Sequence, residues 1–160
     1  TPFEMMFNST KLMPALYDVL YKVISSYPYP VQLLWKKTFK TSLPNFLARL
    51  IGFSFWLSSS NDLMNYVDRL KKFSLPVIFN YLKIMHDFNG DKILSDITCP
   101  TLCVAGERDL VIPEPVMANI HSKIKDSKYV VIPWGSHFPQ IDLPELFNMR
   151  LEEFLQEIKY

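Results

Sequence analysis

Two residues of this chain, Asp109 and His137, have the side chains and the setting that acid–base chemistry needs. Each lies in a loop that follows a short apolar segment, Asp109 in 106–113 and His137 in 134–138. A carboxylate that holds one nitrogen of an imidazole fixes the tautomer of the ring and leaves the other nitrogen free as a base. The two residues are therefore a candidate catalytic acid and a candidate base, if the fold brings their loops together.

The segments before the two loops have the composition of buried strands. Residues 100–105 and 128–133 are short, apolar and partly β-branched. Residues 115–125 and 143–159 have the apolar spacing of helices. A crossover of roughly twenty residues is too long for a hairpin, so the strands are predicted to be parallel. Parallel strands end at the same edge of a sheet, and neighbours lie about 4.8 Å apart, which would let the two side chains meet.

Two parallel strands do not make an independent sheet, because both faces and both edges need cover. We therefore expect a missing N-terminal core or a second chain to cover the sheet edge. The chain begins at Thr1 without an initiator methionine. It is accordingly expected to begin inside a longer gene product or after processing.

The region before the strands is expected to be helical throughout, so we divide the chain into 1–91 and 92–160. Apolar residues recur at helical spacing in five segments, namely 10–27, 31–39, 43–57, 62–73 and 75–88. Asn89-Gly90 predicts a left-handed stop after the last of them. Three helix starts share a capping residue before Leu-Pro, at Ser42, Ser74 and Asp142, and Glu145 would complete a capping box with Asp142.

Three segments of the second region resemble the α/β-hydrolases. The sequence ITCPTLCVAGERD at 97–109 resembles the late strand and acid loop of that family. The sequence VVIPWGSHF at 130–138 resembles its last strand and histidine loop, and LPELFN at 143–148 with EFL at 153–155 resembles its closing helix. The resemblance implies an α/β fold, namely a partial α/β-hydrolase. Residues 1–91 would form a helical cap, and 92–160 the C-terminal β-α-β-α segment of the core.

The same resemblance makes Asp109 the triad acid and His137 the general base of a serine-type hydrolase acting on a small ester or acyl substrate. The family places its nucleophile upstream in a G-x-S-x-G turn, and this sequence contains none. In the nearest string, GFSFW, Trp56 stands where a small residue is required, and Ser54 falls in a predicted helix. The parent protein is thus expected to be an enzyme, and this chain alone to be inactive.

Other hypotheses remain open at this point. The chain could be a non-catalytic fragment or interaction module, or part of an acyltransferase, dehalogenase or cofactor-free peroxidase of the same fold. Glu107 is a rival carboxylate that we expect to be surface charge, and Ser136 could orient His137. Six apolar residues could line an acyl pocket or be ordinary core, namely Phe53, Phe55, Trp56, Met64, Met85 and Phe88.

The composition limits the kinds of partner and cofactor that we expect for this protein. The net charge of +1 gives no sign of nucleic-acid binding, and no apolar run reaches the ~20 residues of a membrane span. The chain has only 4 glycines, no phosphate-binding loop and no metal-ligand cluster, so we expect no cofactor and no metal. The expected partner is a small-molecule substrate. Cys99 and Cys103 are expected to be buried and reduced, which favours a cytoplasmic protein.

Overall fold

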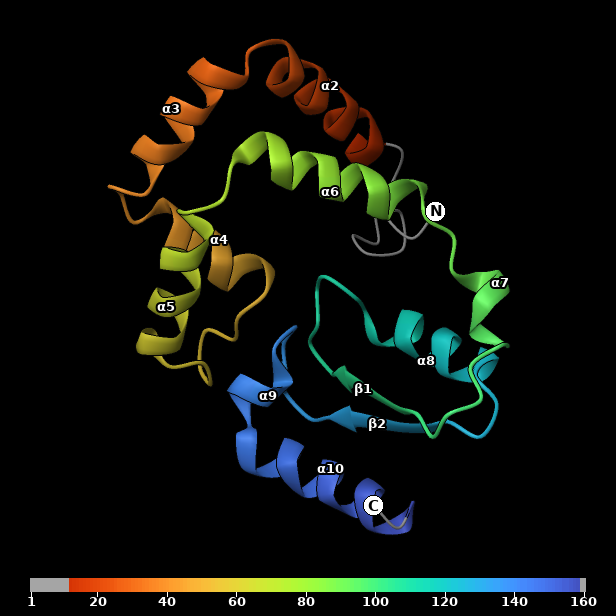
Figure 1. The fold of residues 1–160 in the computed structure, drawn as a ribbon. Helices are drawn as coiled ribbons and strands as arrows, with labels where there is room; N and C mark the ends of the chain where they lie inside the picture. Colours follow the sequence, from red (N-terminus) through yellow and green to blue (C-terminus); the bar gives the residue numbers. More distant parts are fainter. Residues whose placement is uncertain (1–11, 159–160) are drawn as a thin grey trace.

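The computed structural model of the protein describes residues 12–158 (Figure 1). The ends of the first and last predicted helices, at 10–11 and 159, lie outside the described residues. The described chain before the first strand is helical, as expected. Its helices are α2 (Leu12–Ser26), α3 (Pro28–Thr38), α4 (Leu43–Ile51), α5 (Ser60–Leu70), α6 (Leu75–Asp87) and α7 (Asp91–Leu94).

A β-α-β unit and two further helices complete the described chain. They are β1 (Leu102–Gly106), α8 (Glu114–Lys123), β2 (Lys128–Ile132), α9 (Pro139–Asp142) and α10 (Pro144–Glu157). The strands pair in parallel, from Leu102 opposite Lys128 to Gly106 opposite Ile132, which confirms the predicted direction. Helices α8 and α10 lie on opposite sides of the two strands (Figure 1). The class is therefore α/β, as predicted, and the described sheet has two strands.

The helices before β1 form two groups. Helices α2 and α3 pack on α6, and α4 packs on α5 (Figure 1). A buried cluster of Phe53, Leu63 and Val67 holds the second group, and Phe138 from the loop after β2 packs against it. The division at 91/92 stays a prediction, and this cluster shows contact across that boundary.

Helix α4 ends earlier than predicted, because the chain turns after Ile51. Two successive N–H groups, of Gly52 and Phe53, donate to the same carbonyl of Ala48. The Ser54 hydroxyl then accepts the N–H groups of Trp56 and Leu57 at 3.3 and 3.1 Å. Ser54 therefore lies in a loop, and the prediction that it falls in a helix was wrong.

Several predicted helix ends are also wrong in detail. A proline stands in the first turn of α4, α6 and α10, as expected. Ser42, however, makes no capping hydrogen bond, because its backbone is helical (φ −77°, ψ −6°) rather than extended. The capping residue of α10 is Leu143, so Asp142 and Glu145 form no capping box. The predicted left-handed stop at Asn89-Gly90 is also wrong, because Gly90 has φ −80°. Helix α6 instead ends before Phe88, whose backbone is extended.

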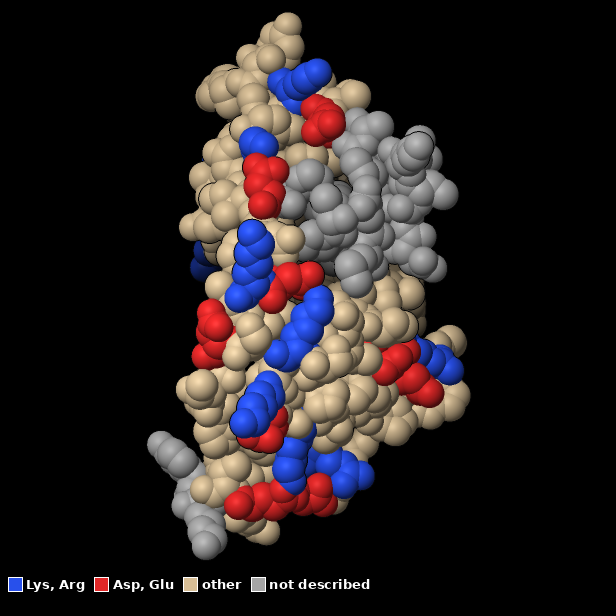
Figure 2. Space-filling model, turned by 90° about the vertical axis from the view of Figure 1, so that its right-hand side faces the viewer, with Lys and Arg blue, Asp and Glu red and all other residues tan. Residues whose placement is uncertain are grey.

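The surface carries charged side chains of both signs. On the face shown in Figure 2, acidic and basic side chains are interspersed rather than gathered by sign. Lys83 pairs with Asp87 and Lys123 with Asp91, at 2.8 and 2.7 Å. Cys103 is buried but Cys99 is exposed, so the expectation that both are buried was wrong for Cys99.

No helix within 12–158 is both long enough and apolar enough to cross a membrane.

The two faces of β2 differ in burial. Ile132 is fully buried, whereas its neighbour Val131 is 36% exposed. We expect Ile132→Ala to lower the free energy of unfolding by about 2–5 kcal/mol, because it removes apolar contacts and leaves a cavity. Val131→Ala should cost about 1 kcal/mol or less. Urea titrations of both variants measure the difference, and equal losses would contradict the assigned strand faces.

Candidate active site

The two residues singled out by the sequence lie side by side. Strands β1 and β2 end at paired residues, so the loops that follow leave the same edge of the sheet. Asp109 Oδ2 lies 3.0 Å from His137 Nδ1. The Asp109 side chain is 8% exposed and that of His137 is 29% exposed. The pair is thus partly shielded from water, which strengthens its electrostatic interaction, while the ring remains accessible.

Asp109 is held in place by its own loop. Its second oxygen, Oδ1, accepts the N–H groups of Val111 and Ile112 at 2.7 and 2.9 Å. Such a local turn is typical of aspartate. Because a carboxylate only accepts hydrogen bonds, His137 must donate from Nδ1, and Nε2 of the neutral ring is then an acceptor. This arrangement suits a general base.

The acid loop and the histidine loop are joined to each other by further contacts. Glu107 N donates to Ile132 O at 3.0 Å, and Arg108 N donates to Gly135 O at 2.8 Å. The rival carboxylate, Glu107, accepts the Trp134 N–H at 2.8 Å. Glu107 is exposed and holds the backbone of the histidine loop, whereas the imidazole contacts Asp109.

Trp134 takes an unusual backbone conformation at this junction. Its φ of 62° is left-handed, which costs free energy in a residue other than glycine. The Arg108 guanidinium lies 3.7 Å from the centre of the indole ring, in cation–π contact. Together with the Glu107 hydrogen bond, this contact stabilises the turn that directs the chain towards His137.

Gly106 explains how the loops approach so closely. A Cβ atom there would lie 2.1 Å from Ser136 O, which no side chain can tolerate. The sequence identified Gly106 only as a strand end. Ser136 donates its hydroxyl to Gly52 O at 2.9 Å, so the side chain binds the loop after α4 rather than the imidazole.

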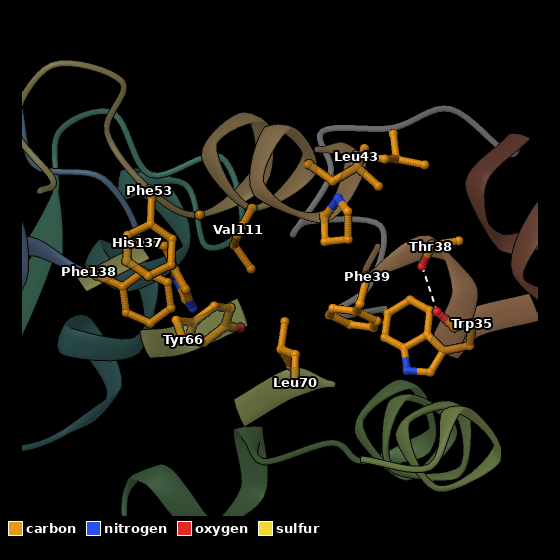
Figure 3. Close-up of a pocket in the computed structure, with 14 residues that line it drawn as sticks. Trp35, Thr38, Phe39, Leu43, Phe53, Tyr66, Leu70, Val111, His137 and Phe138 are labelled. Carbon is orange, nitrogen blue, oxygen red and sulfur yellow. Dashed lines mark hydrogen bonds between the residues drawn. The ribbon is translucent and has the colours of Figure 1, made fainter. Parts of the chain in front are cut away.

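An apolar cavity of about 400 Å³ lies beside His137 (Figure 3). Its walls come from α3, α4, α5, the segments that follow α3 and α4, and the acid and histidine loops. They include Trp35, Phe39, Leu43, Leu47, Phe53, Tyr66, Leu70, Val111 and Phe138. In Figure 3, Leu70 and Val111 point into the same space from opposite sides. Burial raises the pKa of the Tyr66 phenol, so this polar lining group is neutral at ordinary pH. Among the lining residues within 12–158, none is an Asp, Glu, Lys or Arg.

The sequence predicted only a small part of the lining of this cavity. Of the six apolar residues proposed for an acyl pocket, Phe53 lines it, whereas the other five are each about half exposed or more and lie outside it, namely Phe55, Trp56, Met64, Met85 and Phe88. Helical spacing marks an apolar face, but it does not tell which face meets the loops of the sheet. Among the described residues, no serine hydroxyl hydrogen-bonds to His137. Within 12–158, no three His, Cys, Asp or Glu residues are grouped to hold a metal ion.

Known proteins resemble the chain both in sequence and in fold, although no family model matches it. The protein named "Putative carbamate hydrolase RutD" from Caulobacter sp. (strain K31) is 27% identical over 103 residues, which are 62% of this chain and 38% of RutD. Serine hydrolase BPHL from Homo sapiens is 34% identical over 64 residues, covering 40% of this chain and 22% of BPHL. The matches thus span less than half the length of these relatives.

Solved structures share the fold over more of the chain. A bromoperoxidase from Bacillus anthracis superposes with a TM-score of 0.62 at 20% identity, over 80% of this chain and 49% of the bromoperoxidase. The α/β hydrolase MGS-MChE2, from a sediment metagenome, gives a TM-score of 0.50 at 22% identity, over 62% of this chain and 45% of that enzyme. The chain therefore has part of the α/β-hydrolase fold. It spans about half of the α/β-hydrolases whose structures it matches.

Proposed function

We propose that this chain supplies the acid and the base of a serine-type α/β-hydrolase that acts on a small ester or acyl substrate. The observation that carries the proposal is the 3.0 Å contact between Asp109 Oδ2 and His137 Nδ1 beside an apolar cavity. The names of the relatives, which are hydrolases, support the reaction class.

The proposed chemistry follows from the hydrogen bonds. Asp109 holds the Nδ1–H of His137, and Nε2 takes the proton from a serine hydroxyl as its oxygen attacks the substrate carbonyl. The imidazolium then gives this proton to the leaving group, and an acyl-enzyme remains. Nε2 next takes a proton from water, whose oxygen attacks the acyl carbonyl. The imidazolium then returns this proton to the serine oxygen as the acyl–serine bond breaks and the acid is released. The Asp109 carboxylate stabilises the imidazolium at both steps.

We further propose that the nucleophile and the oxyanion donors come from a part of the fold that the relatives have and this match does not cover. Ser54 is a poor candidate nucleophile, because its hydroxyl already accepts two backbone N–H groups of its own turn. Within the described sheet, β1 pairs with β2 on one side only. We propose that the other edge of β1 pairs with a further parallel strand, from additional core or from a second chain.

The cavity supports a substrate with an uncharged, apolar group. Its volume of about 400 Å³ suits a small acyl or aryl group, and its lining offers no ionic partner. A charged group would have to leave water without compensation, which costs several kcal/mol. The polar reacting carbonyl would lie towards His137, at the edge of the cavity that the acid loop borders.

A non-catalytic role is the second candidate. It is favoured by the lack, among the described residues, of a serine bonded to His137. In that case the open edge of β1 would bind another chain through backbone hydrogen bonds. The Asp109–His137 pair would then be a structural contact, and its loss would change only the stability of the fold.

Mutation of the acid tests the catalytic proposal. In the active protein, we expect Asp109→Asn to lower kcat by up to about 10⁴-fold, the effect of removing a triad acid in a serine protease. Asp126→Asn is the matched control, because Asp126 is exposed and lies before the start of β2. Its backbone is left-handed, a conformation that asparagine also tolerates. Steady-state kinetics with an activated ester measure both variants. A loss below tenfold in folded Asp109→Asn would reject the acid role.

A charge placed in the cavity tests the substrate class. We expect Leu70→Glu to lower kcat/KM for a neutral aryl or alkyl ester by about 10–100-fold, because it puts a carboxylate against the apolar group. Leu34→Glu is the control, since Leu34 is 63% exposed on α3 and outside the cavity. Competition between a neutral ester and one with a carboxylate in its acyl chain measures the preference. Equal losses in both variants would exclude the cavity as the binding site.

A further inference from the structure

A second buried carboxylate, Asp142, lies close to the candidate site but takes no part in the chemistry proposed above. Asp142 is 5% exposed. Its Oδ2 accepts the backbone N–H of Ser136 at 2.6 Å, and its Oδ1 accepts the hydroxyl of Ser58 in a short hydrogen bond. Ser136 directly precedes His137. The carboxylate therefore holds the residue beside the candidate base.

The other partner of Asp142 belongs to a loop far away in sequence. Ser58 lies 84 residues before Asp142, in the loop that follows α4. Its Oγ also accepts the Ser54 N–H at 3.0 Å. The Arg49 guanidinium donates to the carbonyls of Ser54 and Ser58 at 3.0 and 3.4 Å, which fixes the two ends of this turn. The carboxylate thus binds a firmly held loop of the helical region.

A second link joins the same two loops. The Ser136 hydroxyl donates to Gly52 O at 2.9 Å. Phe138, on the other side of His137, packs against Phe53 with ring centroids 4.5 Å apart and a tilt of 34° between the rings. The Phe138 and His137 rings meet edge to face, with centroids 5.0 Å apart. Gly52, Phe53 and Phe138 all line the apolar cavity. The cavity wall and the histidine loop are therefore parts of one bonded unit.

We propose that Asp142 is a positioning residue, whose carboxylate holds Ser136 and so fixes His137 against both Asp109 and the wall of the cavity. The inference rests on the proposed function, in which His137 is the base. A carboxylate suits the task because it has two oxygens and accepts from both donors at once, without the need to donate. Hydrogen bonds to a charged acceptor are also shorter and stronger than neutral ones.

This role replaces the helix-capping role that the sequence indicated for Asp142. The first N–H groups of α10 receive no hydrogen bond from this side chain, and both of its oxygens face the loops instead. Because the donors Ser136 N and Ser58 Oγ are buried with it, loss of the acceptor would leave them unpaired. The expected consequence is a histidine loop that opens more often, with a weaker Asp109–His137 contact.

The test observes the His137 Nδ1 proton directly, by NMR of the chain labelled with ¹⁵N-histidine. In the wild-type protein this proton is expected to exchange slowly with water, because it is bonded to Asp109. Asp142→Asn and Ser58→Ala should each speed its exchange about tenfold, since each weakens the hold on the loop. Glu145→Gln is the control, because Glu145 is exposed and three residues beyond Asp142. It should leave the exchange rate unchanged.

The outcomes separate a positioning role from a structural one. A lower melting temperature in Asp142→Asn with an unchanged His137 proton would mean that Asp142 only stabilises the fold, and would overturn the proposal. Should Asp142→Asn fail to fold, Ser58→Ala decides, because it removes only the two hydrogen bonds of the Ser58 hydroxyl, to Asp142 and from Ser54 N, and adds no group. The Asp109→Asn variant tests the proposed function separately. If the His137 Nδ1 proton exchanges in this variant at the wild-type rate, Asp109 does not hold the imidazole. The proposed acid–base pair is then rejected, and the positioning role of Asp142 with it.

Discussion

The parallel hydrogen bonds between β1 and β2 determine where the candidate site can form. The pairing of Gly106 with Ile132 places the ends of both strands at one edge of the sheet. Each strand is followed there by a loop, one carrying Asp109 and the other His137. Backbone contacts from Glu107 and Arg108 to the histidine loop set the spacing more finely. An antiparallel arrangement would put the same two side chains at opposite edges. The local sequence around each residue is thus not enough to form the candidate site, because only this pairing brings the two side chains together.

The histidine loop is supported on two sides, and each support has a different physical character. The acid loop contacts it through backbone hydrogen bonds, the Asp109 carboxylate and the stacking of Arg108 on Trp134. The helical region contacts it through the Asp142 carboxylate and through the packing of Phe138 in the apolar cluster. A ligand in the cavity would touch the second support and His137 together. Substrate binding and base positioning are therefore coupled in this account.

The features that the sequence predicted are those decided locally. Apolar, β-branched segments bounded by Pro and Gly gave the two strands, and the length of the crossover gave their direction. Asp109 and His137 could be proposed because each follows a strand directly. Ser58 and Asp142 could not, because they are 84 residues apart and no local pattern links them. The end of α4 at Ile51 was missed for a similar reason, since side-chain and backbone contacts of the following turn outweigh the helical spacing of Leu57.

The proposed catalysis requires that Asp109 occupies Nδ1 of His137 and that Nε2 faces the apolar cavity. Alkylation with a bromomethyl ketone that carries an apolar tail, followed by peptide mapping, tests it most directly. His121 is the internal reference, because its Nδ1 is also engaged, by Ser127 at 2.7 Å, and it does not line this cavity. The account predicts modification of His137 at Nε2, faster than that of His121 by about tenfold or more, because the cavity concentrates the reagent. Equal rates at the two histidines, or modification of His137 at Nδ1, would contradict it.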